Sequence, residues 1–82
     1  MKFYSDDSHG WLACPKALLK EYGISERITV YSYMNGDTAY LEEDIDACTL
    51  VDALATSGIV PEYDWRRVNG RSRIRSYARF NP

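Results

Sequence analysis

The sequence lacks any apolar run near the roughly 18 residues that a membrane-spanning helix requires. It has only two cysteines, Cys14 and Cys48, which are too few for a disulfide scaffold, so we expect reduced and unbonded thiols. Residues 1–7 contain none of the apolar core of a signal peptide. These absences predict a cytoplasmic protein with no membrane partner.

Catalytic and metal-binding motifs are also missing. The single histidine, His9, lies near Asp6 and Asp7, but their spacing matches no standard metal site. The acidic run Glu42-Glu43-Asp44, with Asp46, lacks the spacing of a calcium loop. Neither cysteine has a histidine at a motif spacing, and both are expected to be buried apolar residues. We therefore expect no enzymatic activity, no metal and no cofactor.

What is present is ordinary for a folded domain. Hydrophobic residues make up 45% and charged residues 27%, which excludes disorder driven by low hydrophobicity and high net charge. The 82 residues predict one domain with a thin core. Residues 1–57 hold four basic and ten acidic residues, a net −6, whereas residues 58–82 hold six arginines and two acidic residues, a net +4. This asymmetry either marks a charged binding surface or lets the two halves neutralise each other.

Residues 10–43 are predicted to form a strand, a short helix and a hairpin. The apolar strand stops at Pro15, because proline has no N–H for a sheet but suits the first turn of a helix. Residues 16–22 place apolar side chains three and four positions apart, as a helix does, and Gly23 supplies a left-handed cap.

The hairpin is predicted to have strands at 28–34 and 37–43 around Asn35-Gly36, because Asn-Gly favours a two-residue type I′ turn. This register places Tyr31 opposite Tyr40. The predicted core face carries Ile28, Val30, Ala39 and Leu41. The other face carries Tyr31, Tyr33 and Tyr40. These tyrosines either form a binding surface or cover a second layer of the protein itself.

A second helix is predicted over residues 44–58, with Asp44 or Asp46 as its N-terminal cap. The tail, residues 61–80, repeats the hairpin pattern around Asn69-Gly70. The predicted order is β-α-β-β-α-β-β. The fold class is α+β: antiparallel hairpins packed with two short helices in a single small domain, residues 1–82.

Two surfaces are candidates for binding. The first joins the tyrosine face to the acidic run, where aromatic anchors and carboxylates suit a basic protein partner. Its residues are Tyr31, Tyr33, Tyr40, Glu42, Glu43 and Asp44. The second is an arginine row on the tail hairpin, where Arg66 opposite Arg73 would be a like-charge pair that nucleic acid or another anion relieves. Its residues are Arg66, Arg71, Arg73, Arg75 and Arg79. The alternative for this row is a solvated edge strand, kept charged against aggregation.

A strand that ends in Pro15, a helix that runs into Tyr22-Gly23-Ile24 and a turn on Asn35-Gly36-Asp37 follow one another in the first half. In these pieces residues 10–43 resemble the AbrB/MazE-type swapped-hairpin module. The resemblance implies an intertwined homodimer that binds DNA. The family's first Gly-Arg is Gly10-Trp11 here, and the segment is acidic.

Three further motifs are His9-Gly10-Trp11, Tyr31-Ser32-Tyr33 and Leu41-Glu42-Glu43-Asp44. They resemble motifs of short, uncharacterised phage and mobile-element proteins. By analogy with small acidic phage proteins, this implies a non-enzymatic inhibitor in the host cell cytoplasm. It would occupy a host protein surface, such as that of a nucleic-acid-handling restriction or CRISPR defence complex. The alternative is a dimeric AbrB/MazE-like DNA-binding regulator that uses the arginine row.

Overall fold

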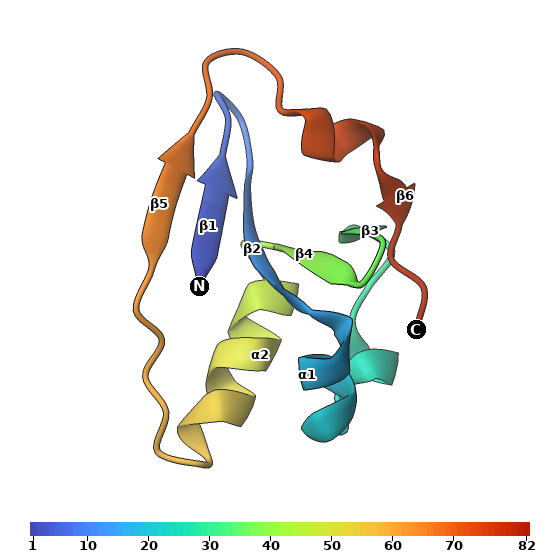
Figure 1. Cartoon of the computed structure of the whole chain (residues 1–82), viewed down its shortest axis with the longest axis vertical. Coiled ribbons are helices and arrows are strands. Elements are labelled where there is room, and N and C mark those ends of the chain that lie inside the picture. The colour runs from blue at the N-terminus through green and yellow to red at the C-terminus, as the bar shows by residue number, and fades with distance from the viewer.

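A six-stranded mixed β-sheet and two helices make up the protein, and the computed structural model describes all 82 residues (Figure 1). The strands are β1 (Lys2–Ser5), β2 (Gly10–Pro15), β3 (Tyr33–Asn35), β4 (Thr38–Glu42), β5 (Asp64–Arg67) and β6 (Ala78–Arg79). Their order in the sheet is β5-β1-β2-β4-β3-β6. The helices are α1 (Lys16–Glu21) and α2 (Asp46–Ala55), with 3₁₀ turns η1 (Ser25–Arg27) and η2 (Arg73–Ser76). The α+β class and the single domain predicted from the sequence are confirmed.

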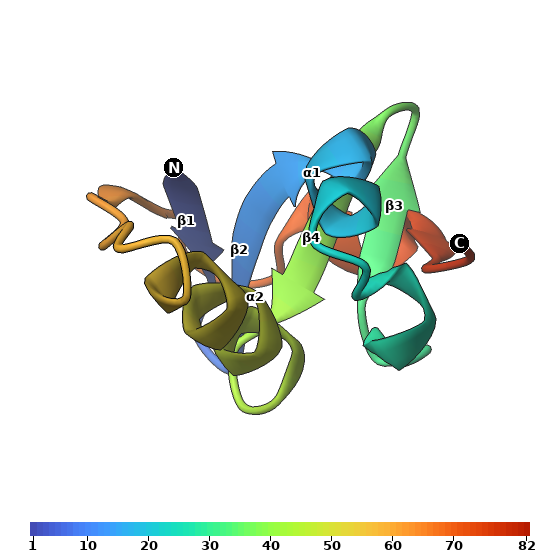
Figure 2. The ribbon, with the colours of Figure 1, turned by 90° about the horizontal axis from the view of Figure 1, so that it is seen from below.

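The core lies between the helices and one face of the sheet. Figure 2 shows both helices toward the viewer at one end of the molecule. Side chains alternate along each strand, so one face of β2 and β4 points at the helices. The core cluster comprises Leu12, Cys14, Leu19, Ile24, Ile28, Ala39, Leu41, Ala47, Leu50, Leu54 and Phe80. Neither helix has the length and apolar character needed to cross a lipid bilayer.

The β3–β4 hairpin turns one residue later than predicted. Tyr33, rather than Tyr31, pairs with Tyr40, so Gly36 and Asp37 are the two central residues of the turn. Of these two turn residues, only Gly36 has a positive φ, +59°. A positive φ at the first central residue alone is typical of a type II′ turn, whereas the expected type I′ turn needs it at both. The partner of each residue shifts by two positions, and side chains of the paired segments therefore keep their predicted faces.

β3 is shorter than the predicted strand 28–34, and residues 28–32 form a loop instead. Thr29 and Ser32 donate hydrogen bonds to the Asp46 carboxylate of α2 rather than joining the sheet in register. As a result Val30, predicted for the core face, is 64% exposed, whereas Ile28 is buried as predicted.

The tail hairpin predicted around Asn69-Gly70 is wrong. β5 pairs in parallel with β1, and β6 pairs antiparallel with β3 at the opposite edge of the sheet. Residues 68–77, hereafter the crossover segment, pass from one edge to the other, in orange to red in Figure 1. β1, which the sequence pattern did not predict, takes the place of the second hairpin strand. The N–H groups of Gly70 and Ser72 bind the Asp7 and Asp6 carboxylates instead of a hairpin partner.

Candidate functional site

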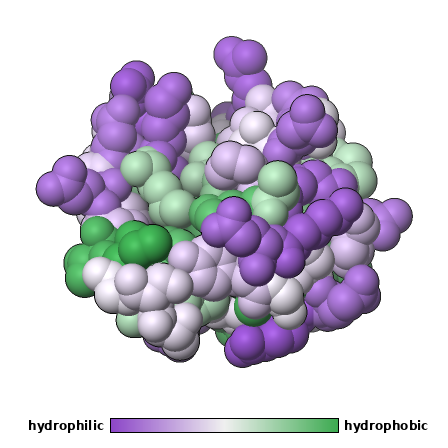
Figure 3. Space-filling model, turned by 60° about the horizontal axis from the view of Figure 1, so that its bottom comes forward, coloured by the Kyte–Doolittle hydropathy of each residue, from purple (hydrophilic) through white to green (hydrophobic).

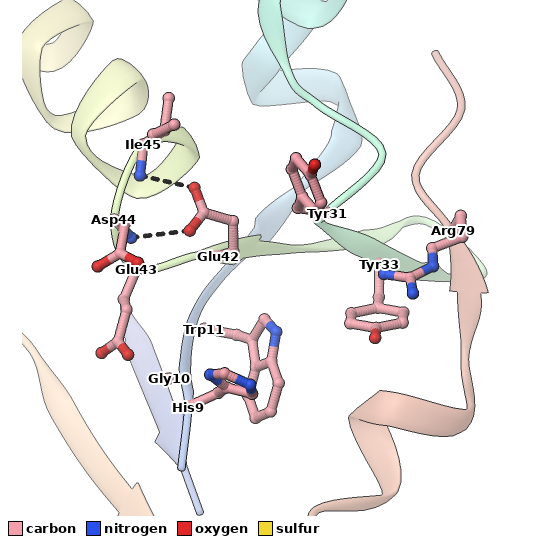
Figure 4. A pocket seen from close by; sticks show the side chains of 10 residues that line it. All are labelled: His9, Gly10, Trp11, Tyr31, Tyr33, Glu42, Glu43, Asp44, Ile45 and Arg79. Atoms are coloured by element: carbon pink, nitrogen blue, oxygen red, sulfur yellow. Dashed lines mark hydrogen bonds between the residues drawn. The ribbon is translucent and has the colours of Figure 1, made fainter.

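A cavity of about 440 Å³ lies on the sheet face opposite the helices, beside the N-terminus of α2 (Figure 4). It is lined by His9, Gly10, Trp11, Tyr31, Tyr33, Glu42, Glu43, Asp44, Ile45 and Arg79. All the residues predicted for protein binding except Tyr40 are therefore brought together here. From the arginine row only Arg79 joins them.

Three aromatic rings in edge-to-face contact form the floor of the cavity. The Trp11 ring is buried, and its centroid lies 6.2 Å from that of Tyr33 and 6.2 Å from that of His9. The Arg79 guanidinium lies 4.7 Å from the Tyr33 ring centroid, in cation–π geometry. In Figure 4 Arg79 and the carboxylates of Glu43 and Asp44 stand on opposite sides of this floor. The cavity is therefore aromatic in the middle and oppositely charged at its two ends.

Glu42 caps α2, which corrects the expectation that Asp44 or Asp46 does so. Its carboxylate accepts the backbone N–H groups of Asp44, Ile45 and Asp46 at 2.9, 2.6 and 2.7 Å. A negative charge is also favourable at the positive end of the helix dipole. Glu42 thus has a structural role, and the exposed carboxylates left for a partner are those of Glu43 and Asp44.

Asp46 positions the loop that carries Tyr31. Its buried Oδ2 accepts hydrogen bonds from the N–H of Thr29 at 3.0 Å, from the Thr29 hydroxyl at 2.7 Å and from the Ser32 hydroxyl. Ser32 Oγ in turn accepts the N–H of Glu42 at 3.0 Å. The loop is therefore tied to both α2 and β4, and Tyr31, 68% exposed, stands at the rim of the cavity.

Tyr40 lies opposite Tyr33 in the sheet, but its ring does not line the cavity. Its ring lies 5.9 Å from that of Tyr4 and 5.3 Å from that of Tyr77 in the crossover segment. Burial in this stack raises the pKa of the Tyr40 hydroxyl, and the nearby Tyr77 and Tyr4 add to the effect. The expectation of a second layer inside the protein therefore fits Tyr40, while Tyr31 and Tyr33 face the cavity.

The predicted arginine row does not form, because residues 71–77 are not a strand. Arg66 lies on β5 and pairs with Asp64 at 2.8 Å, and it does not lie opposite Arg73. Arg75 pairs with Asp6, and Arg79 covers Tyr33. The two remaining members, Arg71 and Arg73, are exposed on the crossover segment.

Asp6 is a buried anchor that was not predicted from the sequence. It accepts the N–H groups of Ser8, His9 and Ser72, and Arg75 binds it through two nitrogens at 2.8 and 2.9 Å. The Arg75 guanidinium and these N–H groups hold the pKa of the Asp6 carboxyl well below its ordinary value, against the opposing effect of burial. The contacts of Asp6 with the N–H groups of Ser8 and His9 form an Asx turn. An aspartate at the start of a polar turn is the sequence signal for such contacts.

Gly10 marks a close approach beside the cavity. A Cβ atom at this position would lie 2.6 Å from Phe3 Cε1 and 2.8 Å from Glu43 Oε2, inside contact distance. Only glycine lets β2 start here without displacing one of these side chains. Gly10 and the neighbouring Trp11 belong to the site, although no binding role is predicted for the His9-Gly10-Trp11 motif from the sequence.

The two cysteines are free and have different surroundings. Cys14 is buried, and burial raises the pKa of its thiol to about 12, so it is protonated at neutral pH. Cys48 is exposed on α2, which corrects the expectation that both are buried. No group of three or more His, Cys, Asp or Glu side chains is placed to hold a metal ion.

A comparison of the chain with protein families, curated proteins and solved structures finds no match.

Proposed function

We propose that this chain is a non-enzymatic binding protein whose cavity takes a basic segment of a protein partner. The convergence of Tyr31, Tyr33, Glu43 and Asp44 around one cavity carries the proposal. Arginine and lysine side chains stack on aromatic faces and pair with carboxylates, so the exposed Tyr31 ring at the rim and the acidic end suit one cationic group. Arg79 would meet an acidic or carbonyl group of the partner at the other end.

The partner we propose is a host protein, with the chain acting as a phage-type stoichiometric inhibitor. Glu43 and Asp44 would take the place of phosphates on a basic surface that normally handles nucleic acid. The acidic first half of the sequence and the motif resemblance to phage proteins support this extension. A defence complex of the restriction or CRISPR kind would offer such a surface.

Calorimetric titration with an oligo-arginine peptide tests the binding mode. Tyr31→Ala is expected to weaken binding by about 2 kcal/mol, roughly 30-fold, because it removes an aromatic anchor. Reversing charge at Glu43 and Asp44 is expected to weaken binding most at low salt. Val30→Ala changes an exposed neighbour in the same loop and should leave the affinity unchanged.

Two outcomes would contradict the proposal. One is equal affinity of the wild type and the Tyr31→Ala variant for the peptide. The other is tight binding of duplex DNA with a steep salt dependence, carried by Arg71 and Arg73, which would favour the DNA-binding regulator instead.

A further inference from the structure

The outer edge of β5 is open. β5 is the end strand of the sheet, and all four of its residues are exposed. The N–H of Asp64 donates to the Met1 carbonyl at 2.8 Å, so the backbone groups of Asp64 and Arg66 face β1. Because alternate residues of a strand direct these groups to opposite sides, those of Trp65 and Arg67 point outward, where no strand pairs with them.

Apolar surface lies along the same edge. Trp65 is 67% exposed and Val60, in the segment before β5, is 86% exposed. The Trp65 ring packs at a tilt against those of Phe3 and Tyr63, at centroid distances of 5.0 and 5.2 Å. Figure 3 shows hydrophobic residues gathered on the left of the molecule, the side on which β5 lies in Figure 1. An open edge beside exposed apolar groups favours pairing with another strand.

We propose that β5 is a homodimer interface in which the β5 strands of two copies pair antiparallel about a two-fold axis. The outward-facing backbone groups of one copy must meet those of the other to form hydrogen bonds. This condition leaves three central registers. Trp65 lies opposite Trp65 of the second copy, or opposite its Tyr63, or opposite its Arg67.

The charges of Asp64 and Arg66 favour one of these three registers. With Trp65 opposite Tyr63, Asp64 meets Asp64 of the second copy, and with Trp65 opposite Arg67, Arg66 meets Arg66. Like charges directly opposite each other are unfavourable. With Trp65 on the axis, each Asp64 lies opposite Arg66 of the other copy and extends the ion pair that the two residues form within one chain. The strand is self-complementary in this register alone.

Charge reversal with mixing tests the proposal by sedimentation velocity. The wild type is expected to be a dimer of about twice 9.4 kDa at micromolar concentration. The single variants Asp64→Arg and Arg66→Asp each bring like charges together and are expected to be monomers. An equimolar mixture of the two is expected to form a heterodimer, because every cross-strand pair is then of opposite sign. The double variant, with both charges reversed, should recover the homodimer.

Asp52→Arg on α2 reverses an exposed charge away from β5 and should leave the dimer intact. Circular dichroism checks that each single variant is folded. A monomeric wild type, or a mixture of folded single variants that stays monomeric, overturns the proposal. A dimer that is insensitive to Asp64 and Arg66 also overturns it and would favour the swapped-hairpin dimer.

Discussion

Asp6 is the residue that joins the first turn of the chain to its C-terminal part. The turn between β1 and β2 and the crossover segment both donate hydrogen bonds to its carboxylate, and Arg75 neutralises its charge. A buried carboxylate without such partners would be strongly unfavourable. The ion pair is therefore a condition for the crossover segment to lie on the sheet.

Replacing this carboxylate should make stability less dependent on pH. The folded pKa of Asp6 lies well below its ordinary value of 3.8. The stability that its ion pair contributes is therefore complete above pH 3.8, decreases below it because the unfolded chain takes up the proton, and is lost as the pH falls through the folded pKa. Asp6→Asn is expected to lower the free energy of unfolding at neutral pH, and the difference from the wild type should shrink toward pH 3. Urea unfolding at a series of pH values measures this difference.

Asp7→Asn is the matched control, because the exposed Asp7 also binds the tail, through Arg67 and Gly70. Its neutral-pH loss should be clearly smaller, since exposed ion pairs contribute little. Equal losses in the two variants at neutral pH would contradict the anchoring role of Asp6.

Elements that are determined by interactions between neighbouring residues were predicted well from the sequence. The helix at 16–22 was predicted within one residue of α1, and its end is closed by the bond from Ile24 N–H to the Leu19 carbonyl. Alternation alone predicted the faces of the residues that pair in the hairpin, but not the exposure of Val30. The exact turn was not predicted, because Asn35-Gly36 and Gly36-Asp37 both place glycine where a positive φ is needed.

Elements that depend on distant partners were predicted poorly. β5 has an Asn-Gly turn after it, yet it pairs with β1, which lies about 60 positions earlier in the chain. The loop 28–32 has the alternation of a strand, but the buried Asp46 side chain competes for Thr29 and Ser32. For the candidate site, Tyr31, Tyr33 and the acidic run were found because they share a face or a run in the sequence. Trp11 and Arg79 were not grouped with them, since only the fold brings them there.

The hydrogen bonds between Asp46 of α2 and the loop at residues 28–32 should contribute strongly to stability. Asp46→Ala removes the acceptor of several hydrogen bonds to Thr29 and Ser32 and leaves their donors unpaired, which should destabilise the protein by about 3 kcal/mol. The exposed Asp52→Ala on the same helix should change stability by less than about 0.5 kcal/mol. Chemical denaturation measures both, and similar values for the two variants would contradict the role assigned to Asp46.

For the whole molecule, the charge asymmetry of the sequence has two consequences in the fold. The basic tail neutralises part of the acidic half through the pairs Asp6–Arg75 and Asp7–Arg67. Glu43 and Asp44 form no ion pair and stay exposed at the cavity. The cavity and the β5 edge are made of different residues, so the two proposed interactions do not compete for the same side chains.

NMR titration of the isotope-labelled protein with an oligo-arginine peptide shows whether the cavity is the binding site. We expect the largest shift changes at the Trp11 indole N–H and at the amides of Tyr31, Glu43 and Asp44, and no response to an oligo-glutamate peptide of equal length. Changes confined to residues outside the cavity, or an equal response to the acidic peptide, would contradict the claim.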